Sequence, residues 1–350
     1  MPKPRLAVVG VGLIGIRHAE LIAASPDAEL AAVADPSPIG PREAGRLGTR
    51  HYADYNDMLD RERPDGVYVA APNQLHLAAG LACIARGIPA VIEKPLCDTL
   101  EAGAELVRAS EAAGVPLLVG HHRRYNPRVE ATREILAGGE LGRIVAVNAL
   151  WAVRKPDEYF DATWRRTAGG GPILINMIHD VDCLRHFCGE IAEVQAYGSS
   201  AARGFEVEDT AVVAVRFVSG ALASIALTDA APSPWGWEAG SGDNPNIAAS
   251  FENCYRFLGT AAALDFPNLT VWKGATAEPA SWADPIHPET RAWAGHEALP
   301  RQLEHFLDVI AGTATPRIDG RDGLATLAAT LAITDAIATG RAAAPAPPPA

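Results

Sequence analysis

The chain has 350 residues, of which 48% are hydrophobic and 21% charged, and its formal net charge is −12. This length predicts about two domains, and the composition predicts that both have a buried core. The negative charge argues against nucleic acid or an anionic membrane surface as a partner, because clustered lysine and arginine bind both. No apolar run approaches the roughly 18 residues of a membrane-spanning helix.

Cysteine and lysine usage is informative. The five cysteines are odd in number and irregularly spaced, without a Cys-x-x-Cys pair, at Cys83, Cys97, Cys183, Cys188 and Cys254. This argues against a disulfide scaffold and against a structural zinc site, so we expect a protein of the reducing cytoplasm. Only 4 lysines stand against 26 arginines, so each lysine position carries more information than usual.

The region from residue 5 to about 120 alternates short apolar runs with amphipathic segments. The runs that predict strands are Leu6–Val9, Leu30–Ala34, Val67–Ala70, Ala90–Glu93 and Pro116–Val119. The segments that predict helices are Ile14–Ala24, Gln74–Arg86 and Leu100–Ala113. Continuous apolar strands separated by helices predict a parallel sheet covered on both faces. We therefore expect a doubly wound α/β domain over residues 1–122.

A second pattern follows. Asn126–Ala137 predicts a linking helix, and Ile173–Phe187 another. The predicted strands alternate apolar and polar residues and are Ile144–Trp151, Val194–Ser199, Thr210–Val218, Ala221–Asp229, Cys254–Leu258 and Leu269–Trp272. Short turns between several of them predict an open, mostly antiparallel sheet with helices on one side. We expect this second α/β domain over residues 123–340, with closing helices within 299–338 that could pack back on the first domain. The Ala/Pro tail 341–350 is expected to be disordered.

Gly10-Val11-Gly12-Leu13-Ile14-Gly15 directly follows the first predicted strand and opens a helix. Glycine permits the tight turn, the approach of a pyrophosphate and helix–strand packing, and the helix N-terminus offers N–H groups to phosphates. Asp35 ends the second strand, where a carboxylate accepts hydrogen bonds from the adenosine ribose. No arginine follows within six residues to neutralise a 2′-phosphate. The pattern predicts NAD as cofactor, bound by Gly10, Gly12, Leu13, Ile14, Gly15 and Asp35; the alternative is a Gly-rich turn beside a surface aspartate.

Glu93-Lys94-Pro95 stands where another predicted strand ends. Ligands of open parallel sheets bind outside the carboxyl ends of the strands, so Lys94 is a candidate site residue; the alternative is a solvated loop lysine. Asn73 follows the preceding strand and could either cap the next helix or contact the cofactor. The further candidate cofactor contacts at these two strand ends are Ala71, Pro72, Asn73, His76, Glu93 and Lys94.

Three consecutive glycines and Pro172 lead into the predicted helix Ile173–Phe187. On this helix Asn176, His179, Asp182 and Cys183 fall at three- and four-residue spacing, so they share one face. A buried polar stripe is costly without partners, and its histidine is a candidate acid–base group. The alternative is a satisfied core histidine capped by Asp182. We expect no metal site, because no third ligand has a recognisable spacing.

The order of these motifs resembles the Gfo/Idh/MocA oxidoreductases, a family named for glucose–fructose oxidoreductase and inositol dehydrogenase. The resemblance spans residues 5–340 and is carried by the Gly10–Gly15 turn, Asp35, the Glu93-Lys94-Pro95 triplet and the Gly-rich turn leading to His179. It implies a Rossmann domain followed by an α/β domain whose open sheet covers the nicotinamide end. It also implies that Lys94 and His179 flank the reacting carbinol.

One position departs from the family pattern. Many members that resemble inositol dehydrogenase have an aspartate four residues before the histidine, where this chain has Ile175. The polar residue is Asn176, three before His179, and asparagine cannot take a proton. We therefore expect Asn176 to orient substrate.

The sequence and this resemblance together predict an NAD-dependent dehydrogenase of a secondary hydroxyl on a sugar, cyclitol or related polyol. His179 is expected to act as general base and Lys94 to stabilise the alkoxide. One alternative is an enzyme on the same fold with another reaction, either a glycoside hydrolase that retains NAD or a dihydrodiol dehydrogenase. Another is an NAD-binding protein without catalysis.

Further predicted substrate contacts are Arg123, Tyr125, Tyr159, Trp164 and Arg165. The adjacent arginines 123 and 124 could bind a carboxylate or phosphate, or they could form interdomain ion pairs. Trp164 beside Arg165 suits stacking on a sugar ring, although Trp164 could also belong to the core. Apolar residues of the second sheet could face outward, so we expect a homodimer or homotetramer formed through the second domains.

Overall fold

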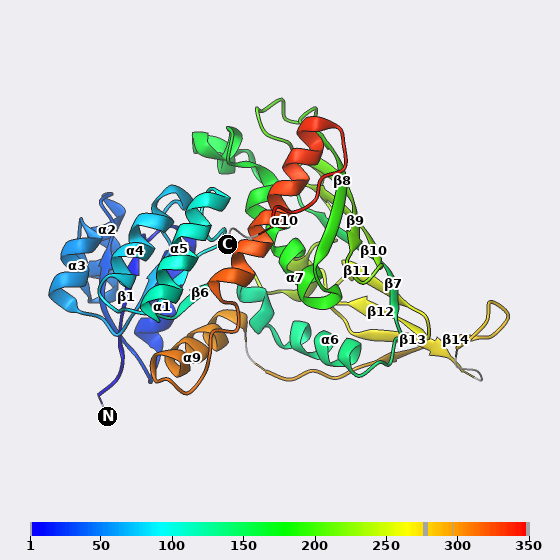
Figure 1. Cartoon of the computed structure of the whole chain (residues 1–350), viewed down its shortest axis with the longest axis horizontal. Coiled ribbons are helices and arrows are strands. Elements are labelled where there is room, and N and C mark those ends of the chain that lie inside the picture. Colours follow the sequence, from blue (N-terminus) through cyan, green and yellow to red (C-terminus); the bar gives the residue numbers. More distant parts are fainter. Residues whose placement is uncertain (1, 276–278, 296, 348–350) are drawn as a thin grey trace. The chain divides into compact units, whose positions relative to one another are not determined.

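The computed structural model describes residues 2–275, 279–295 and 297–347 (Figure 1). The chain forms two compact units. The first contains the chain up to His122 together with Leu299–Leu327, and the second contains Arg123–Ala298 and Ala328–Ala346. Among the helices described, none combines the length and apolarity needed to cross a membrane.

Within the described residues, the first unit holds a six-stranded parallel sheet of order β3-β2-β1-β4-β5-β6. Its strands are β1 (Arg5–Val9), β2 (Glu29–Ala34), β3 (Arg50–Tyr52), β4 (Gly66–Val69), β5 (Ala90–Ile92) and β6 (Leu117–Val119). The helices between them are α1 (Leu13–Ala24), α2 (Ile39–Leu47), α3 (Tyr55–Glu62), α4 (His76–Ile84) and α5 (Leu100–Ala113). The strand order reverses between β1 and β4, which is where ligands bind in doubly wound folds. The predicted Rossmann-type sheet is confirmed.

Local chemistry explains these boundaries. Leu6 and Val8 of β1 are fully buried, as expected for a strand with both faces covered. The Thr99 hydroxyl accepts the Ala102 N–H at the start of α5, and Gly114 ends that helix in the left-handed conformation. The helix α9 (Ala298–Ile310) supplies Phe306 to the same core, although it begins 289 residues after the end of β1 (298 − 9).

The described part of the second unit contains an eight-stranded sheet of order β14-β13-β12-β11-β7-β10-β9-β8. Its strands are β7 (Ile144–Ala152), β8 (Ile191–Ser199), β9 (Thr210–Phe217), β10 (Leu222–Thr228), β11 (Tyr255–Gly259), β12 (Ala262–Phe266), β13 (Thr270–Gly274) and β14 (Ile286–Thr290). Neighbouring strands run antiparallel, apart from β7 and β10, which pair in parallel. The predicted mostly antiparallel sheet is therefore confirmed.

One face of this sheet carries helices. Figure 1 shows α6 (Pro127–Ala137) and α7 (Ile178–Cys188) on that face. Trp151 from β7, Val213 from β9 and Phe187 from α7 are buried together in the core of the unit. The last helix, α10 (Gly320–Thr339), adds Ile333 to the same core.

Two local features differ from expectation. The helix that carries His179 begins with a π-helical turn, Ile173–Met177, before the α-helical part starts at Ile178. The chain is also ordered beyond residue 341, because Ala343 exchanges both backbone hydrogen bonds with Val194 of β8. The expectation of a disordered tail was wrong at that point, because an open strand edge offers N–H and C=O partners even to an Ala/Pro segment. Residues 348–350 lie outside the described residues.

Candidate active site

The glycines of the first turn differ in what surrounds them. Gly10 has φ +86°, and a Cβ there would lie 2.7 Å from the Ala70 carbonyl oxygen. A Cβ at Gly15 would lie 2.0 Å from the Gly10 carbonyl oxygen, so a side chain would separate α1 from β1. Gly12 has no atom within 4 Å of its Cβ position. This arrangement of a tight turn, close packing and an open backbone fits the pyrophosphate of a dinucleotide.

Asp35, at the end of β2, is tied to this turn. Its carboxylate accepts the Val11 N–H at 2.9 Å, and the Ser37 N–H and hydroxyl at 2.8 and 2.6 Å. Burial acts to raise the pKa of Asp35, but the hydrogen bonds from Ser37 and Val11 leave it below its usual value. The carboxylate is therefore ionised at neutral pH beside the turn, where it can accept from ribose hydroxyls and repel a phosphate.

Lys94 lies two residues after the end of β5, and it is half-buried. Its backbone N–H donates to Glu93 Oε2 at 3.2 Å, and Glu93 Oε1 lies 2.7 Å from Nε2 of His18 on α1. Burial acts to raise the pKa of Glu93, but His18 more than offsets it, and the pKa falls to about 2. Glu93, a predicted cofactor contact, is thus a buried carboxylate paired with a histidine.

The residues that follow β4 lie partly inside the protein. Asn73 opens a 3₁₀ turn, and no side-chain cap bond is present there or at the start of α4, so the capping alternative for Asn73 is wrong. His76 is buried, and its ring nitrogens lie 2.9 Å from the carbonyl oxygens of Ala71 and Pro95. His76 therefore connects the ends of β4 and β5.

In the second unit, Asn176 and His179 come from the same helix. Asn176 lies in the π-helical turn, where its Oδ1 is buried and accepts no hydrogen bond from the residues the structure describes. His179 is buried in the first turn of α7. The prediction that Asn176 and His179 share one helix face assumed α-helical spacing throughout. A π-helical turn has more residues per turn, so the predicted spacing does not hold at Asn176. Such turns are frequent at functional sites.

The N-terminus of that helix is held by Glu208, a residue the sequence did not single out. Glu208 Oε1 accepts the Ile173 N–H at 2.9 Å. A Cβ at Gly171 would lie 2.7 Å from the same oxygen, and Gly171 has φ +84°. This glycine therefore makes room for the carboxylate that anchors the turn before Asn176.

Arg123 and Tyr125 are buried, each 1% exposed. Arg123 Nη1 lies 3.0 Å from Asp180 Oδ1, and its Nη2 lies 2.7 Å from Glu238 Oε1. The Tyr255 hydroxyl donates to the same Asp180 oxygen. All of these residues belong to the second unit, so the ion pairs of Arg123 lie within one domain.

Arg165 forms a cation–aromatic cluster with its neighbours. Its guanidinium carbon lies 4.0 Å from the ring centre of Tyr159 and 5.3 Å from that of Trp164. Trp164 is 54% exposed, so the alternative that it belongs to the core is wrong. Lys155 lies 4.8 Å from the Tyr159 ring and 3.2 Å from Asp229 Oδ2. Lysine is rare in this chain, and this rarity is the sequence signal that could have singled out Lys155.

Comparison with known proteins identifies the fold family. Residues 4–121 match a family model described as an oxidoreductase family with an NAD-binding Rossmann fold, and residues 129–265 match the GFO/IDH/MocA C-terminal domain. 1,5-Anhydro-D-fructose reductase from Ensifer adhaerens is 34% identical over 80% of this chain and 79% of that protein. The chain belongs to the Gfo/Idh/MocA family of oxidoreductases.

Other relatives extend the comparison. An inositol 2-dehydrogenase from Rubrobacter xylanophilus is 33% identical over 67% of either chain. A crystal structure of the WlbA dehydrogenase from Bordetella pertussis, in complex with NADH and UDP-GlcNAcA, is 27% identical, covers 99% of either chain and has a TM-score of 0.78. The present chain therefore has the same fold, over 99% of its length, as a structure that contains NADH.

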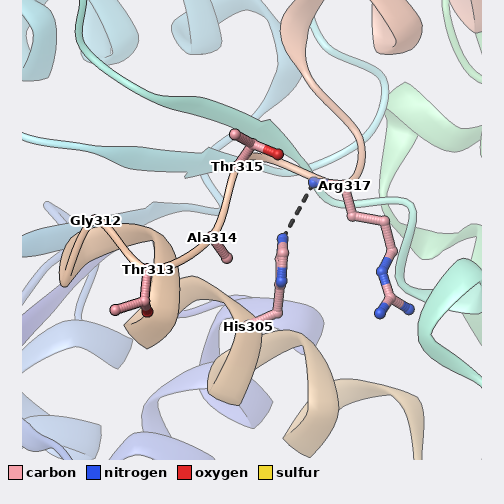
Figure 2. A pocket seen from close by; sticks show the side chains of 6 residues that line it. All are labelled: His305, Gly312, Thr313, Ala314, Thr315 and Arg317. Carbon is pink, nitrogen blue, oxygen red and sulfur yellow. Dashed lines mark hydrogen bonds between the residues drawn. The ribbon is translucent and has the colours of Figure 1, made fainter.

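A pocket elsewhere in the first unit contains none of the predicted site residues. Figure 2 shows it at the end of α9, lined by His305, Gly312, Thr313, Ala314, Thr315 and Arg317. His305 Nε2 accepts the Arg317 N–H at 3.1 Å, so the histidine fastens the segment that follows the helix. We assign this pocket no part in the reaction.

Proposed function

We propose that the protein is an NAD-dependent dehydrogenase that oxidises a secondary hydroxyl of a sugar or cyclitol. The observation that carries this proposal is the position of Lys94 at the carboxyl end of β5, in the same sheet as the open Gly10–Gly15 turn. The relatives named anhydrofructose reductase and inositol 2-dehydrogenase support a polyhydroxylated substrate.

In the proposed reaction His179 accepts the proton of the substrate hydroxyl as general base. Lys94 donates a hydrogen bond to the same oxygen as negative charge develops on it. Bound NAD would supply the hydride acceptor. Asn176 Oδ1, which is buried without a partner among the described residues, accepts a hydrogen bond from a second substrate hydroxyl.

The other substrate contacts are revised in this proposal. Trp164 is exposed, Tyr159 and Arg165 beside it are partly buried, and this aromatic and cationic cluster is suited to a sugar ring. Arg123 and Tyr125 are assigned to the buried framework, because the Arg123 guanidinium already binds Asp180 and Glu238. Similarly, we assign Glu93 and His76 to the support of the Lys94 loop, whereas Leu13, Ile14, Ala71, Pro72 and Asn73 remain proposed cofactor contacts.

The direct test is a substrate panel with NAD and NADH. We expect NADH formation from myo-inositol or another cyclitol or sugar, or NADH consumption with 1,5-anhydro-D-fructose. Turnover of a glycoside without added NAD and without net NADH would favour the glycoside hydrolase alternative. NAD binding without turnover of any cyclitol, sugar or dihydrodiol would favour the non-catalytic alternative.

The ionised Asp35 should make the enzyme prefer NAD. We expect NAD to bind at least about tenfold more tightly than NADP, a difference of roughly 1.4 kcal/mol, because the carboxylate repels the 2′-phosphate. Asp35→Ser and Asp35→Asn should both narrow this ratio in fluorescence titrations. Ser37→Ala is the matched control, because it removes a hydrogen bond to Asp35 but keeps the charge. Equal affinity of the unmodified protein for both cofactors would refute the role of Asp35.

The outer face of the second sheet is the proposed dimer surface. Strand alternation leaves Val212 of β9 54% exposed, with Tyr197 and Ala226 opposite it in register. The large apolar side chains exposed on the strands of this sheet are Val145, Tyr197, Val212, Leu222, Leu258, Trp272 and Ile286. Apolar patches of this kind on a soluble protein mark contacts with another subunit.

We expect light scattering at micromolar concentration to give the mass of a dimer or tetramer. Val212→Glu should lower that mass, because the dimer would bury an unpaired carboxylate. Val218→Glu is the control, since Val218 is exposed in the turn after β9. A monomeric mass for the unmodified protein would contradict this proposal.

A further inference from the structure

A buried histidine–carboxylate pair lies next to Lys94 in the first unit. His18 is 2% exposed and Glu93 4%, and His18 Nε2 lies 2.7 Å from Glu93 Oε1. His18 belongs to α1, the helix opened by the Gly10–Gly15 turn. Glu93 directly precedes Lys94. The pair therefore joins the proposed cofactor-binding helix to the strand end that carries the proposed catalytic lysine.

Both oxygens of Glu93 are used. Oε1 lies against His18, and Oε2 accepts the Lys94 backbone N–H. The low pKa of Glu93 means that it is a carboxylate throughout the neutral range. The Glu93 carboxylate therefore has two fixed partners, the His18 ring on α1 and the backbone N–H of Lys94.

The surrounding elements are shaped to this pair. The His18 ring stacks on Tyr68 of β4, with ring centres 4.4 Å apart. A Cβ at Gly120, one residue after β6, would lie 2.9 Å from the Glu93 carboxylate. Stacking on Tyr68 therefore holds the His18 ring, and the absence of a side chain at Gly120 makes room for the Glu93 carboxylate.

The residue on the other side of Lys94 is also held. The Pro95 carbonyl oxygen lies 2.9 Å from Nδ1 of His76, and the Ala71 carbonyl oxygen lies 2.9 Å from Nε2 of the same ring. Lys94 therefore stands between two residues whose positions are fixed by buried histidines. Neither histidine is exposed enough to reach a ligand.

We infer that His18 and Glu93 are positioning residues that orient Lys94 relative to α1, an inference that rests on the proposed function of Lys94. A buried carboxylate with a hydrogen-bonded partner is by itself weak evidence for stability, because apolar replacements of similar volume are often neutral. A role in placing the Lys94 ammonium explains why a carboxylate and a histidine occupy this buried position. The pair acts through Lys94 and touches neither substrate nor cofactor.

The primary test uses two conservative variants. His18→Phe keeps an aromatic ring beside Tyr68 but removes the contact with Glu93, and Glu93→Gln keeps the size of the side chain without a buried unpaired charge. We expect either change to lower kcat at least about tenfold, since misplacement of a catalytic group by about an ångström is that costly. KM for the sugar or cyclitol and Kd for NAD should change less than about twofold, because the contacts that set them are untouched.

The matched control is Tyr52→Phe, which removes a hydrogen bond to Glu62, another buried carboxylate of the first unit. It should leave kcat unchanged. Thermal unfolding of all variants separates positioning from a general loss of structure. Glu93→Ala should be slower than Glu93→Gln, because only glutamine retains an acceptor for the Lys94 N–H. Equal kcat for Glu93→Gln, His18→Phe and the unmodified enzyme would overturn the inference.

A double-mutant cycle separates this inference from the proposed function. If His18 acts through Lys94, His18→Phe should have little further effect on kcat in a Lys94→Ala background. A full additional loss there would overturn the positioning role, while the role of Lys94 would stand. Near-normal kcat for Lys94→Ala alone would instead refute the proposed function.

A readout independent of turnover is available because the chain has four lysines. Reductive methylation with a ¹³C label gives few resonances, and the Lys94 signal can be assigned with Lys94→Arg. His18→Phe and Glu93→Gln should shift this signal and leave those of Lys3 and Lys273 in place, whereas Tyr52→Phe should shift none. An unmoved Lys94 resonance in both variants would overturn the inference even if no substrate had been found.

Discussion

Lys94→Ala and His179→Ala should each lower kcat by at least about a hundredfold while NAD still binds. Loss of a general base typically costs about 10²–10⁴-fold, and loss of one hydrogen-bond donor to a developing oxyanion about 10²–10³-fold. The proposed NAD contacts come chiefly from the Gly10–Gly15 turn and Asp35, which neither substitution alters. Steady-state kinetics on the best substrate and NAD fluorescence titration measure the two effects separately.

The chain offers matched controls for this pair of variants. Lys273→Ala removes a lysine of β13, and His287→Ala removes an exposed histidine of β14. Both should leave kcat unchanged. The double variant of Lys94 and His179 should lose less than the product of the single losses, because residues that act on one reacting oxygen are not additive. Near-normal kcat for Lys94→Ala would favour the non-catalytic NAD-binding alternative.

A milder effect is expected at Asn176. If its amide only orients the substrate, Asn176→Ala should chiefly raise KM. A fall in kcat as large as that of His179→Ala would instead give Asn176 a part in the chemical step.

The first domain was predictable because its physical constraints are local. A strand buried on both faces must be continuously apolar, and Leu6–Val9 shows this in the sequence. Gly10 and Gly15 are needed because a side chain at either position would collide with backbone atoms. β3 was missed because Arg50–Tyr52 is a short edge strand without an apolar run. β3 is held as a strand by its hydrogen bonds to β2, and its own residues do not predict one.

The polar network of the site was only partly predictable, because its partners are far apart in the sequence. Arg123 and Asp180 are 57 residues apart, and Arg123 and Glu238 are 115 apart. Spacing within one segment cannot show such pairs. The available signal was compositional: adjacent arginines at a strand end need acidic partners if they are buried.

Two further features of the site depend on backbone detail. The π-helical turn before His179 has no composition signal that we can name, although Gly171 and Glu208 define where it begins. His18 was missed because one histidine on an amphipathic helix resembles any half-buried polar residue. Its role became visible only when the fold brought α1 beside the end of β5.

The second large effect is expected on stability. Arg123→Met should lower the free energy of unfolding by about 3–5 kcal/mol, because removing one member of a buried ion pair leaves the other uncompensated. Asp180 is 1% exposed, and the side chain of Glu238 is 15% exposed. Trp151 and Tyr255 would still hydrogen-bond these carboxylates but could not neutralise them. Urea denaturation measures the change.

The matched control is Arg154→Met, in which the guanidinium and its partner Asp157 are largely exposed. It should change the unfolding free energy by less than about 0.5 kcal/mol. The unfolding free energy of Arg123→Lys should lie between those of Arg123→Met and Arg154→Met. Lysine keeps the charge but cannot offer the planar fork that reaches both Asp180 and Glu238.

The pH dependence tests whether the loss at Arg123 is electrostatic. Burial raises the pKa of Asp180 even with Arg123 present. Burial also acts to raise the pKa of Glu238, but Arg123 and Trp151 more than offset it and leave that pKa below its usual value. Without the arginine both folded-state pKa values should rise above those of the unfolded chain. A carboxyl group of this kind destabilises the folded state at high pH, and the cost is relieved as pH falls through its folded pKa.

The deficit of Arg123→Met should therefore be smaller at about pH 5 than at about pH 8. A deficit of the same size at both pH values would point to lost packing rather than lost charge. If Arg123 instead bound a substrate carboxylate or phosphate, Arg123→Met would leave the unfolding free energy nearly unchanged and raise KM. That result would restore the substrate-binding alternative and remove Arg123 from the buried framework that underlies the His179 helix.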